Sequence, residues 1–209
     1  FDFVLAELGV SSMQIDNPKR GFSFKVDGPL DLRLNQEKGI SAAERLDTID
    51  REELAGMLYE NSDEPYCEEL AKAITDEIRR GNRIDTTTKL REIIEKTLDF
   101  LPEKEKKETV KKTCQRVFQA LRIDVNQEFE VLYEFMEKLP NALRPGGRAA
   151  ILTFHSGEDK LVKAALKDGY RNGIYKEYSK DVVRPSANEC VQNPRARSTK
   201  MRWAIRAEE

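Results

Sequence analysis

The sequence predicts an α/β protein that carries an inserted, all-helical segment. Short apolar runs read as strands near both ends of the chain, at Phe3–Glu7 (FVLAE) and at residues 148–154 (RAAILTF), and the tail 201–206 (MRWAIR) alternates. Residues 41–135 show helical periodicity and capping signals instead. A chain of 209 residues suits one compact domain, or a domain carrying an insertion.

Each terminal element has its own local signal. The run 3–7 lacks alternation, which is typical of a strand buried on both faces of a parallel sheet. The alternating tail predicts a final antiparallel edge strand, and residues 158–168 a helix stopped by Gly169. Residues 17–39 contain five Gly and Pro residues, so an ordered loop is expected there.

Capping signals mark helix starts inside the insertion. SAAE from Ser41 and DREE from Asp50 both resemble capping boxes. Further helices are expected from Glu68 to Gly81, after the threonine cluster 86–88, over 110–125 and over 127–143.

Composition excludes several classes of protein. The 36 basic and 38 acidic side chains leave no sequence-wide basic footprint for nucleic acid, although local patches remain possible. Three scattered cysteines, Cys67, Cys114 and Cys190, fit reduced thiols in a cytoplasmic protein better than a disulfide framework or a zinc site. No apolar stretch approaches the roughly 20 residues that cross a bilayer, so no membrane partner is expected.

Polar residues follow two of the expected strands, where ligands bind in open α/β sheets. At the first strand end, Glu7 can accept hydrogen bonds, Gly9 permits close approach of a backbone, and Gln14 offers an amide. The second strand ends at Phe154 and is followed by His155, the only histidine of the chain. Either end alone reads as an ordinary loop, but the two together favour a site.

His155 has two interpretations, catalysis or a structural hydrogen bond that holds a loop. A metal site is not expected, because there is no second histidine and no cysteine lies nearby in sequence. The G-x-S-x-G frame of a nucleophile elbow is also missing, which argues against a serine hydrolase.

Two further segments carry charge in a suggestive pattern. Asp31 and Arg33 in DGPLDLR either orient a polar substrate or form an internal salt bridge. The tail offers Asn193 and four basic residues without an intervening acid, which suits phosphate contacts or a solvated loop: Arg195, Arg197, Lys200 and Arg202.

Seven ordered motifs carry a resemblance to a family. They are LGVSS-x-Q-x-D, RGFSF-x-x-DGPLDLR, SAAE, FQALRI-x-VN, L-x-PGGR, FHS-x-ED and NPRARS, and they span almost the whole chain. Together they resemble the bacterial 16S ribosomal RNA cytosine-N4 methyltransferases of the MraW or RsmH type.

The resemblance implies the C-terminal half of a class I, Rossmann-like methyltransferase sheet (1–36 and 127–209) with an inserted helical domain (37–126). It implies S-adenosylmethionine as the methyl donor and a cytidine of 16S rRNA in the small ribosomal subunit as the acceptor; whether the protein forms a homodimer stays open. The resemblance places Glu7, Gly9 and Gln14 at the cofactor and His155, Ser156 and Asp31 at the reacting base. It also implies RNA contacts by Arg33, Asn193, Arg195, Arg197 and Lys200.

The chain departs from the family pattern at several points. Glu7 and Gly157 stand where the family has aspartate and leucine, and KKTCQRVFQ replaces HPATRTFQ. The glycine-rich cofactor segment has no counterpart here, so the main donor-binding segment is expected to be missing from this chain.

Three interpretations follow: an rRNA methyltransferase, a catalytically degenerate RNA- or ribosome-binding homologue, and a helical protein-interaction module.

Overall fold

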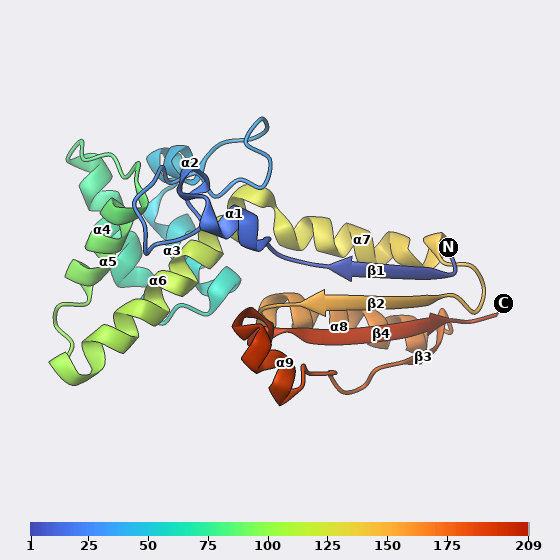
Figure 1. Ribbon diagram of the computed structural model, residues 1–209. Coiled ribbons are helices and arrows are strands. Elements are labelled where there is room, and N and C mark those ends of the chain that lie inside the picture. The colour runs from blue at the N-terminus through green and yellow to red at the C-terminus, as the bar shows by residue number, and fades with distance from the viewer. Residues whose placement is uncertain (209) are drawn as a thin grey trace. The chain divides into compact units, whose positions relative to one another are not determined.

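A computed structural model describes residues 1–208, and their contacts divide the chain into two compact units (Figure 1). The sheet unit comprises Phe1–Gly9 and the chain from Phe129 onward, and the helical unit comprises Val10–Glu128. The predicted α/β class with an inserted helical region is confirmed. Contacts group residues 10–36 with the helices, whereas the domain limits after 36 and 126 remain a prediction.

The sheet unit is built on four strands in the order β1-β2-β4-β3. β1 (Phe3–Glu7) runs parallel to β2 (Arg148–Thr153), with Glu7 opposite Leu152. β4 (Lys200–Arg206) is antiparallel both to β2 and to β3 (Tyr175–Tyr178). The carboxyl ends of β1 and β2 therefore lie at the same edge, as a site at two strand ends requires.

Two strand predictions are wrong. β4 is antiparallel as expected but lies inside the sheet, because the short strand β3 occupies the edge beside it. β1 is not buried on both faces: Phe3 and Leu5 are 56% and 59% exposed. Within β1, only Val4 and Ala6 pack against the apolar core of this unit, and they lie on the opposite face of the strand.

That core lies between the sheet and two helices, α7 (Glu128–Ala142) and α8 (Ser156–Arg171). Its buried members come from all these elements: Leu132, Met136, Leu139, Leu143, Ala149, Ile151, Val162, Leu166, Tyr175 and Ala204. Gly169 does not stop α8, contrary to expectation. A Cβ at Gly169 would lie 2.5 Å from Cδ2 of Tyr175, so this glycine makes room for a buried ring within a continuing helix.

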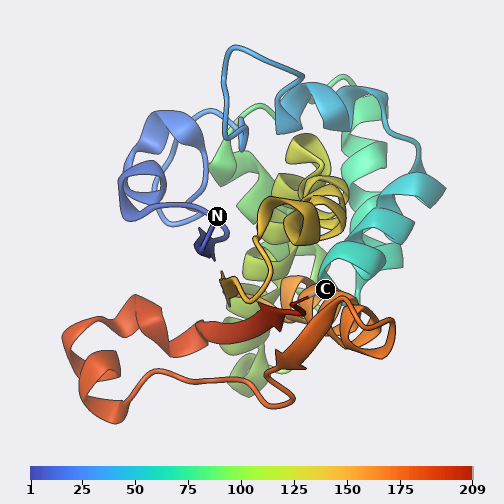
Figure 2. The ribbon, with the colours of Figure 1, turned by 90° about the vertical axis from the view of Figure 1, so that its right-hand side faces the viewer.

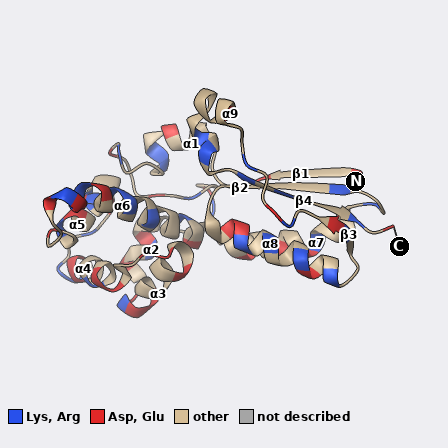
Figure 3. Cartoon of the chain, turned by 90° about the horizontal axis from the view of Figure 1, so that it is seen from below, with Lys and Arg blue, Asp and Glu red and all other residues tan. Residues whose placement is uncertain are grey.

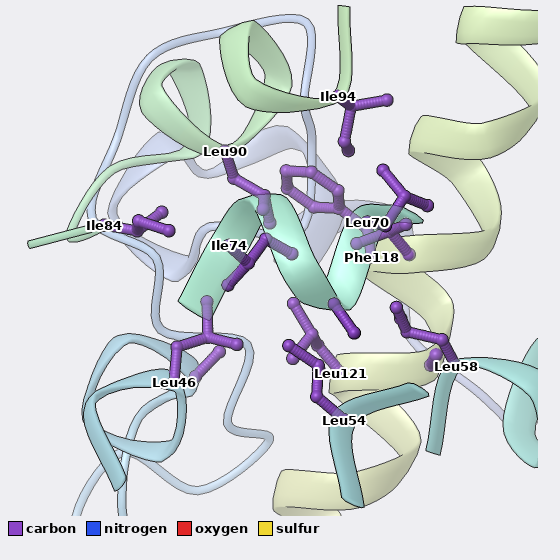
Figure 4. Close-up of a cluster of buried hydrophobic side chains, with 14 of the residues drawn as sticks. Leu46, Leu54, Leu58, Leu70, Ile74, Ile84, Leu90, Ile94, Phe118 and Leu121 are labelled. Carbon is purple, nitrogen blue, oxygen red and sulfur yellow. The ribbon is translucent and has the colours of Figure 1, made fainter. Parts of the chain in front are cut away.

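The helical unit contains five longer helices around one apolar core (Figure 4). They are α2 (Ala42–Thr48), α3 (Arg51–Ser62), α4 (Cys67–Arg79), α5 (Thr87–Thr97) and α6 (Glu103–Asn126). Leu46, Leu58, Ile74, Leu90 and Leu121 are each at most 1% exposed. Burial of side chains of this size stabilises the unit by roughly 1.5–3 kcal/mol each relative to exposure.

The helix starts follow the predicted capping chemistry. Ser41 forms a complete capping box with Glu44, and the side chain of Asp50 accepts a hydrogen bond from the Glu53 amide. α4 ends just before Gly81, which has a φ of +85°. α6 begins several residues earlier than expected. Its first turns are charged, so the apolar periodicity that marks the rest of the helix is missing there.

The expected loop 17–39 is ordered and contains only a short 3-10 turn, Pro18–Arg20. Ahead of it, the first expected strand end continues into a short helix, α1 (Ser12–Asp16). None of the helices within residues 1–208 combines the length and the apolar character needed to cross a membrane.

Candidate functional site

His155 lies where β2 gives way to α8, and it is the N-cap of that helix. Its φ and ψ of −140° and 165° are extended, as an N-cap requires. Nδ1 of the ring accepts a hydrogen bond of 3.4 Å from the amide of Glu158. His155 thus makes a structural hydrogen bond, one of its two interpretations from the sequence, and the bond caps a helix.

The cap also determines which ring nitrogen carries the proton. Because Nδ1 of His155 accepts a hydrogen bond, the neutral ring is protonated on Nε2. Nε2 lies 3.3 Å from Oε1 of Glu158, but within residues 1–208 no group makes a hydrogen bond of good geometry to it. The ring therefore holds a buried N–H at Nε2 that makes no hydrogen bond of good geometry and lies against the Glu158 carboxylate.

Glu158 supports this junction from the first turn of α8. Its other oxygen, Oε2, accepts a hydrogen bond of 2.9 Å from the amide of Phe154. Phe129 packs against the His155 ring, with the ring centroids 6.0 Å apart. Gly157 leaves space for both rings, since a Cβ there would lie 2.7 Å from Cζ of Phe129 and 3.2 Å from the His155 ring.

Ser156 is the first residue of α8 and is exposed. Its hydroxyl makes no hydrogen bond to any group in the described part of the chain. The structure thus brings His155 and Ser156 together at the start of one helix, at the carboxyl end of β2.

Asp159, one residue further along α8, forms a buried ion pair with Arg202 of β4. Nε and one terminal nitrogen of Arg202 donate to the two carboxylate oxygens over 2.7 and 3.2 Å. Burial raises the pKa of Asp159, but hydrogen bonds and charge from Arg202, together with the charge of Lys200, outweigh it, so the pKa is lowered overall. Nζ of Lys200 lies 3.7 Å from the same carboxylate.

Between β3 and β4 the chain forms an arm, residues 179–199, that carries α9 (Ala187–Gln192) and a 3-10 turn (Pro194–Ser198) (Figure 2). Asn193, Arg195 and Arg197 are exposed on this arm. Arg202 is not available for phosphate contacts, because it is 3% exposed and paired with Asp159. Figure 3 shows the basic residues of this region beside the sheet.

The candidate residues at and after the end of β1 are divided between the two units. Glu7, the last residue of β1, is exposed, and Gly9 has a φ of +86°, which favours glycine. Gln14 belongs to the helical unit, where it forms a reciprocal capping box with Ser11 at the start of α1. Its Oε1 accepts a hydrogen bond from the Ser11 amide, which holds the side chain in the cap of α1.

In the helical unit, Asp31 and Arg33 form the internal salt bridge that was one of the two alternatives. Arg33 donates to Asp31 from Nε over 2.7 Å and from a terminal nitrogen over 3.0 Å. The carboxylate also accepts from the backbone amide of Arg33 and from Nε2 of Gln36. Burial raises the pKa of Asp31, but these hydrogen bonds outweigh it and lower the pKa overall.

The predicted reacting-base residues are therefore divided between the two units, His155 and Ser156 in one and Asp31 in the other. Their predicted roles, and those of the cofactor and RNA residues, remain predictions. Sequence reasoning did not single out Glu158, Asp159 or Asn126 as contributors. The adjacent acids after FHS were a usable signal, since carboxylates in the first turn of a helix commonly serve its cap.

A model of the MraW methylase family matches residues 1–207. The chain belongs to the MraW methylase family. The four strands and the inserted helices are accordingly part of a Rossmann-like methyltransferase fold.

Several relatives resemble this MraW-family chain along its whole length. Ribosomal RNA small subunit methyltransferase H 1 of Agathobacter rectalis is 85% identical over 208 residues, which are 100% of this chain and 60% of that protein. The protein of the same name from Lachnoclostridium phytofermentans is 74% identical over 99% of this chain and 57% of its own length. A ribosomal RNA small subunit methyltransferase H from Cyanothece sp. is 41% identical over 99% of this chain and 66% of its own length. This MraW-family chain thus spans 57–60% of the first two relatives.

Proposed function

We propose that this chain takes part in methylating the exocyclic N4 amine of a cytidine in 16S rRNA, with S-adenosylmethionine as the methyl donor. The family match over residues 1–207 and the names of the relatives support rRNA methylation. The observation that carries the proposal is the His155 junction. It places a histidine ring and an exposed serine hydroxyl side by side at the carboxyl end of a sheet strand, where ligands of α/β enzymes bind.

The residues at the end of β1 fit a donor with an amino group and ribose hydroxyls. Glu7 offers an exposed carboxylate there, and the left-handed backbone at Gly9 leaves one face free of a Cβ. Glu7 and Gly9 would hold the donor from the sheet unit, and the cofactor contact of Gln14, in the helical unit, stays an expectation from the family resemblance. S-adenosylmethionine supplies an electrophilic methyl group on a sulfonium centre.

The cytosine amine is a weak nucleophile because its lone pair is delocalised into the ring, so orientation should supply much of the rate enhancement. With Nδ1 engaged in the helix cap, Nε2–H is the donor through which His155 would orient an acceptor on the edge of the base, and this atom is buried beside Glu158 before the base enters. The Ser156 hydroxyl can accept from the amine and hold its N–H bonds in place. The base must be unstacked to reach these groups.

RNA binding is assigned to two sets of residues. Asn193, Arg195 and Arg197 are exposed on the arm and suit phosphate contacts, with Lys200 as a weaker contributor because it is close to Asp159. Arg33 contributes from the helical unit, and Asp31 acts through it by holding its guanidinium. Binding through these cations should weaken as salt concentration rises.

The test uses the full-length gene product with labelled S-adenosylmethionine and small ribosomal subunits that lack the modification. After nuclease digestion, labelled N4-methylcytidine is the expected product. Label in another nucleoside would overturn the assignment to the N4 amine, and no label in RNA would overturn the proposed activity.

Two variants then separate capping from chemistry at His155. Asparagine is among the best N-cap residues, so His155→Asn should keep the thermal stability of the wild type, whereas His155→Ala should lose roughly 1 kcal/mol. If the ring acts on the base, both variants lose methyl transfer. Full activity of His155→Asn would reduce the histidine to a helix cap.

The second candidate function is an RNA- or ribosome-binding homologue without transfer. The observation that favours it is the packing around Gly157, where Phe129 fills the space that a leucine would need. Subunit binding that falls with salt, without any label in RNA, would establish this function. Binding that ignores both salt and RNA would instead favour a protein-interaction module.

A further inference from the structure

Leu32 has a backbone conformation that is costly for its residue type. Its φ is +64°, in the left-handed region, and its side chain is 1% exposed within the core of the helical unit. Residues other than Gly, Asn and Asp rarely adopt this conformation, because it brings the Cβ close to the backbone, and it persists only where the surrounding structure enforces it. Leu32 stands between Asp31 and Arg33, so the strain is located within the pair that the sequence singled out.

Asn126, the last residue of α6, holds the backbone on both sides of Arg33. Its Nδ2 donates to the Leu32 carbonyl over 2.7 Å, and its Oδ1 accepts from the Leu34 amide over 2.7 Å. Nδ2 also donates to the carbonyl of Arg122 over 2.8 Å, which ties the side chain to its own helix. The amide thus acts as a bridge between α6 and the strained turn.

A second side chain fixes the same turn from the opposite end of the loop. A terminal nitrogen of Arg20 donates to the carbonyls of Arg33 and Leu34 over 3.2 and 2.6 Å. The Leu32 amide donates in turn to the Arg20 carbonyl over 3.0 Å. The left-handed turn at Leu32 is therefore held by several independent hydrogen bonds.

This arrangement determines what the Arg33 guanidinium can do. Nε and one terminal nitrogen pair with Asp31, and the other terminal nitrogen donates to the Gly39 carbonyl over 3.1 Å. Three of the five N–H groups of an arginine are thereby used. The other two N–H groups have no hydrogen-bond acceptor within residues 1–208, and the Arg33 side chain is 18% exposed. A fixed guanidinium with two N–H groups left over suits one phosphate or nucleobase oxygen.

We propose that Asn126 is a positioning residue, which acts through the strained turn at Leu32 to hold Arg33 in the orientation that meets the RNA substrate. The inference rests on the proposed function for the identity of the ligand. The positioning itself is independent of that function. The Asn126 side chain forms hydrogen bonds only with backbone groups, those of Leu32, Leu34 and Arg122, so it acts on Arg33 through the backbone.

The positioning is tested first without any substrate, by NMR measurement of hydrogen exchange at arginine Nε–H groups in the 209-residue chain. Asn126→Leu removes all three hydrogen bonds and keeps the branching at Cγ, and Asn126→Asp keeps the size of the side chain and only the acceptor. We expect exchange at Arg33 to rise by roughly tenfold in the leucine variant, and by less in the aspartate variant.

Two internal controls distinguish positioning from general loosening. Arg45 is paired with Asp124 near the same end of α6, with Nε 2.9 Å from the carboxylate, so its exchange should stay unchanged. Asn61→Leu removes another hydrogen bond to α6, 3.1 Å to the Ala120 carbonyl, and should leave Arg33 unaffected. Unchanged exchange at Arg33, or an equal rise at Arg45, would overturn the proposal.

The link to RNA is tested by a double-mutant cycle in the full-length protein. Asn126→Leu alone should weaken RNA binding by roughly tenfold, and it should have almost no further effect in an Arg33→Ala background. Additive losses would show that Asn126 does not act through Arg33. A wild type that neither binds nor methylates RNA would instead contradict the proposed function and leave the exchange result standing.

Discussion

Asp159 and Arg202 join the first turn of α8 to the centre of the sheet through two parallel hydrogen bonds, 2.7 and 3.2 Å long. A terminal nitrogen of Arg202 also donates to the Lys180 carbonyl over 3.2 Å, at the start of the arm. One guanidinium therefore connects the helix capped by His155 to the segment that carries the exposed arginines. Its side chain is only 4% exposed, so the pair is shielded from water.

Arg202→Met should destabilise the sheet unit strongly. The substitution leaves the Asp159 carboxylate buried without its main partner, which typically costs about 3–5 kcal/mol. Urea denaturation followed by circular dichroism measures the loss. Lys138→Met, which breaks an exposed pair with Glu134 on α7, is the control and should leave the midpoint unchanged. Equal midpoints for the two variants would show that the buried pair adds no stability.

The stability of the chain should fall on the acid side partly because of Asp159. Its pKa in the folded state is lowered from the 3.8 of an ordinary aspartate. Its contribution is therefore complete above that value and is lost as the pH falls through the folded-state pKa. Unfolding free energies measured at a series of pH values should show a shallower acid slope for Asp159→Asn than for the wild type. An unchanged slope would argue that other carboxylates dominate acid unfolding.

Glu64 should have the opposite dependence on pH. Burial raises its pKa above the 4.5 of an ordinary glutamate, and its hydrogen bonds with the Tyr66 amide and Thr113 only partly compensate. In the unfolded chain this carboxyl loses its proton at a lower pH than in the folded chain. Folding therefore becomes less favourable as the pH rises from the unfolded-state pKa through the folded-state pKa. Glu64→Gln removes the charge at nearly the same shape and should raise the thermal midpoint at neutral pH. A lower midpoint would mean that Arg116, 3.8 Å away, contributes more than burial costs.

Gly157 and Phe129 should behave as a matched pair. Gly157→Leu places a Cβ 2.7 Å from the Phe129 ring, and overpacking of this kind typically costs about 1–3 kcal/mol. Adding Phe129→Ala opens the space and should recover part of that loss. Thermal denaturation of the two single variants and the double variant measures the coupling. Strictly additive losses would show that the two positions do not compete for the same volume.

Gly169 and Gly56 offer a comparison of two glycines inside helices. Gly169→Ala puts a Cβ against the buried Tyr175 ring and should destabilise by about 1–3 kcal/mol. Gly56→Ala meets no atom within 4 Å in α3 and should stabilise by about 0.5–1 kcal/mol through the lower backbone entropy of the unfolded chain. The sign of each change follows from chemical denaturation. The same sign for both would contradict the packing explanation of Gly169.

Local signals in the sequence predict local structure well. β1 begins and ends as expected, because it coincides with a short apolar run that a glycine follows two residues later. Ser41 caps its helix for a similarly local reason. Gly169 shows the limit of such signals. A glycine reads as a helix stop because of its backbone freedom, whereas here its missing Cβ is what matters, and the ring that needs the space lies on another element.

The candidate site could be located from the sequence but not assembled. The order of apolar and polar residues is enough to place Glu7 and His155 at the ends of two strands, whereas the partners that fix the site come from distant positions. Arg202 is 43 residues from Asp159, and Asn126 is 94 residues from Leu32. Pairings over such separations depend on sheet order and on a left-handed turn at a leucine, neither of which local periodicity reveals.

The place of β4 between β2 and β3 has a consequence for synthesis on the ribosome. β2 and β3 emerge first but have no hydrogen bonds to each other, and both depend on a strand, Lys200–Arg206, that is translated about twenty residues after β3. The helical unit is contiguous and complete by residue 128, so it can fold while the sheet still waits for its central member. Until that strand arrives, one edge of β2 stays exposed, and a nascent chain stalled before residue 200 should be the form that chaperones bind most.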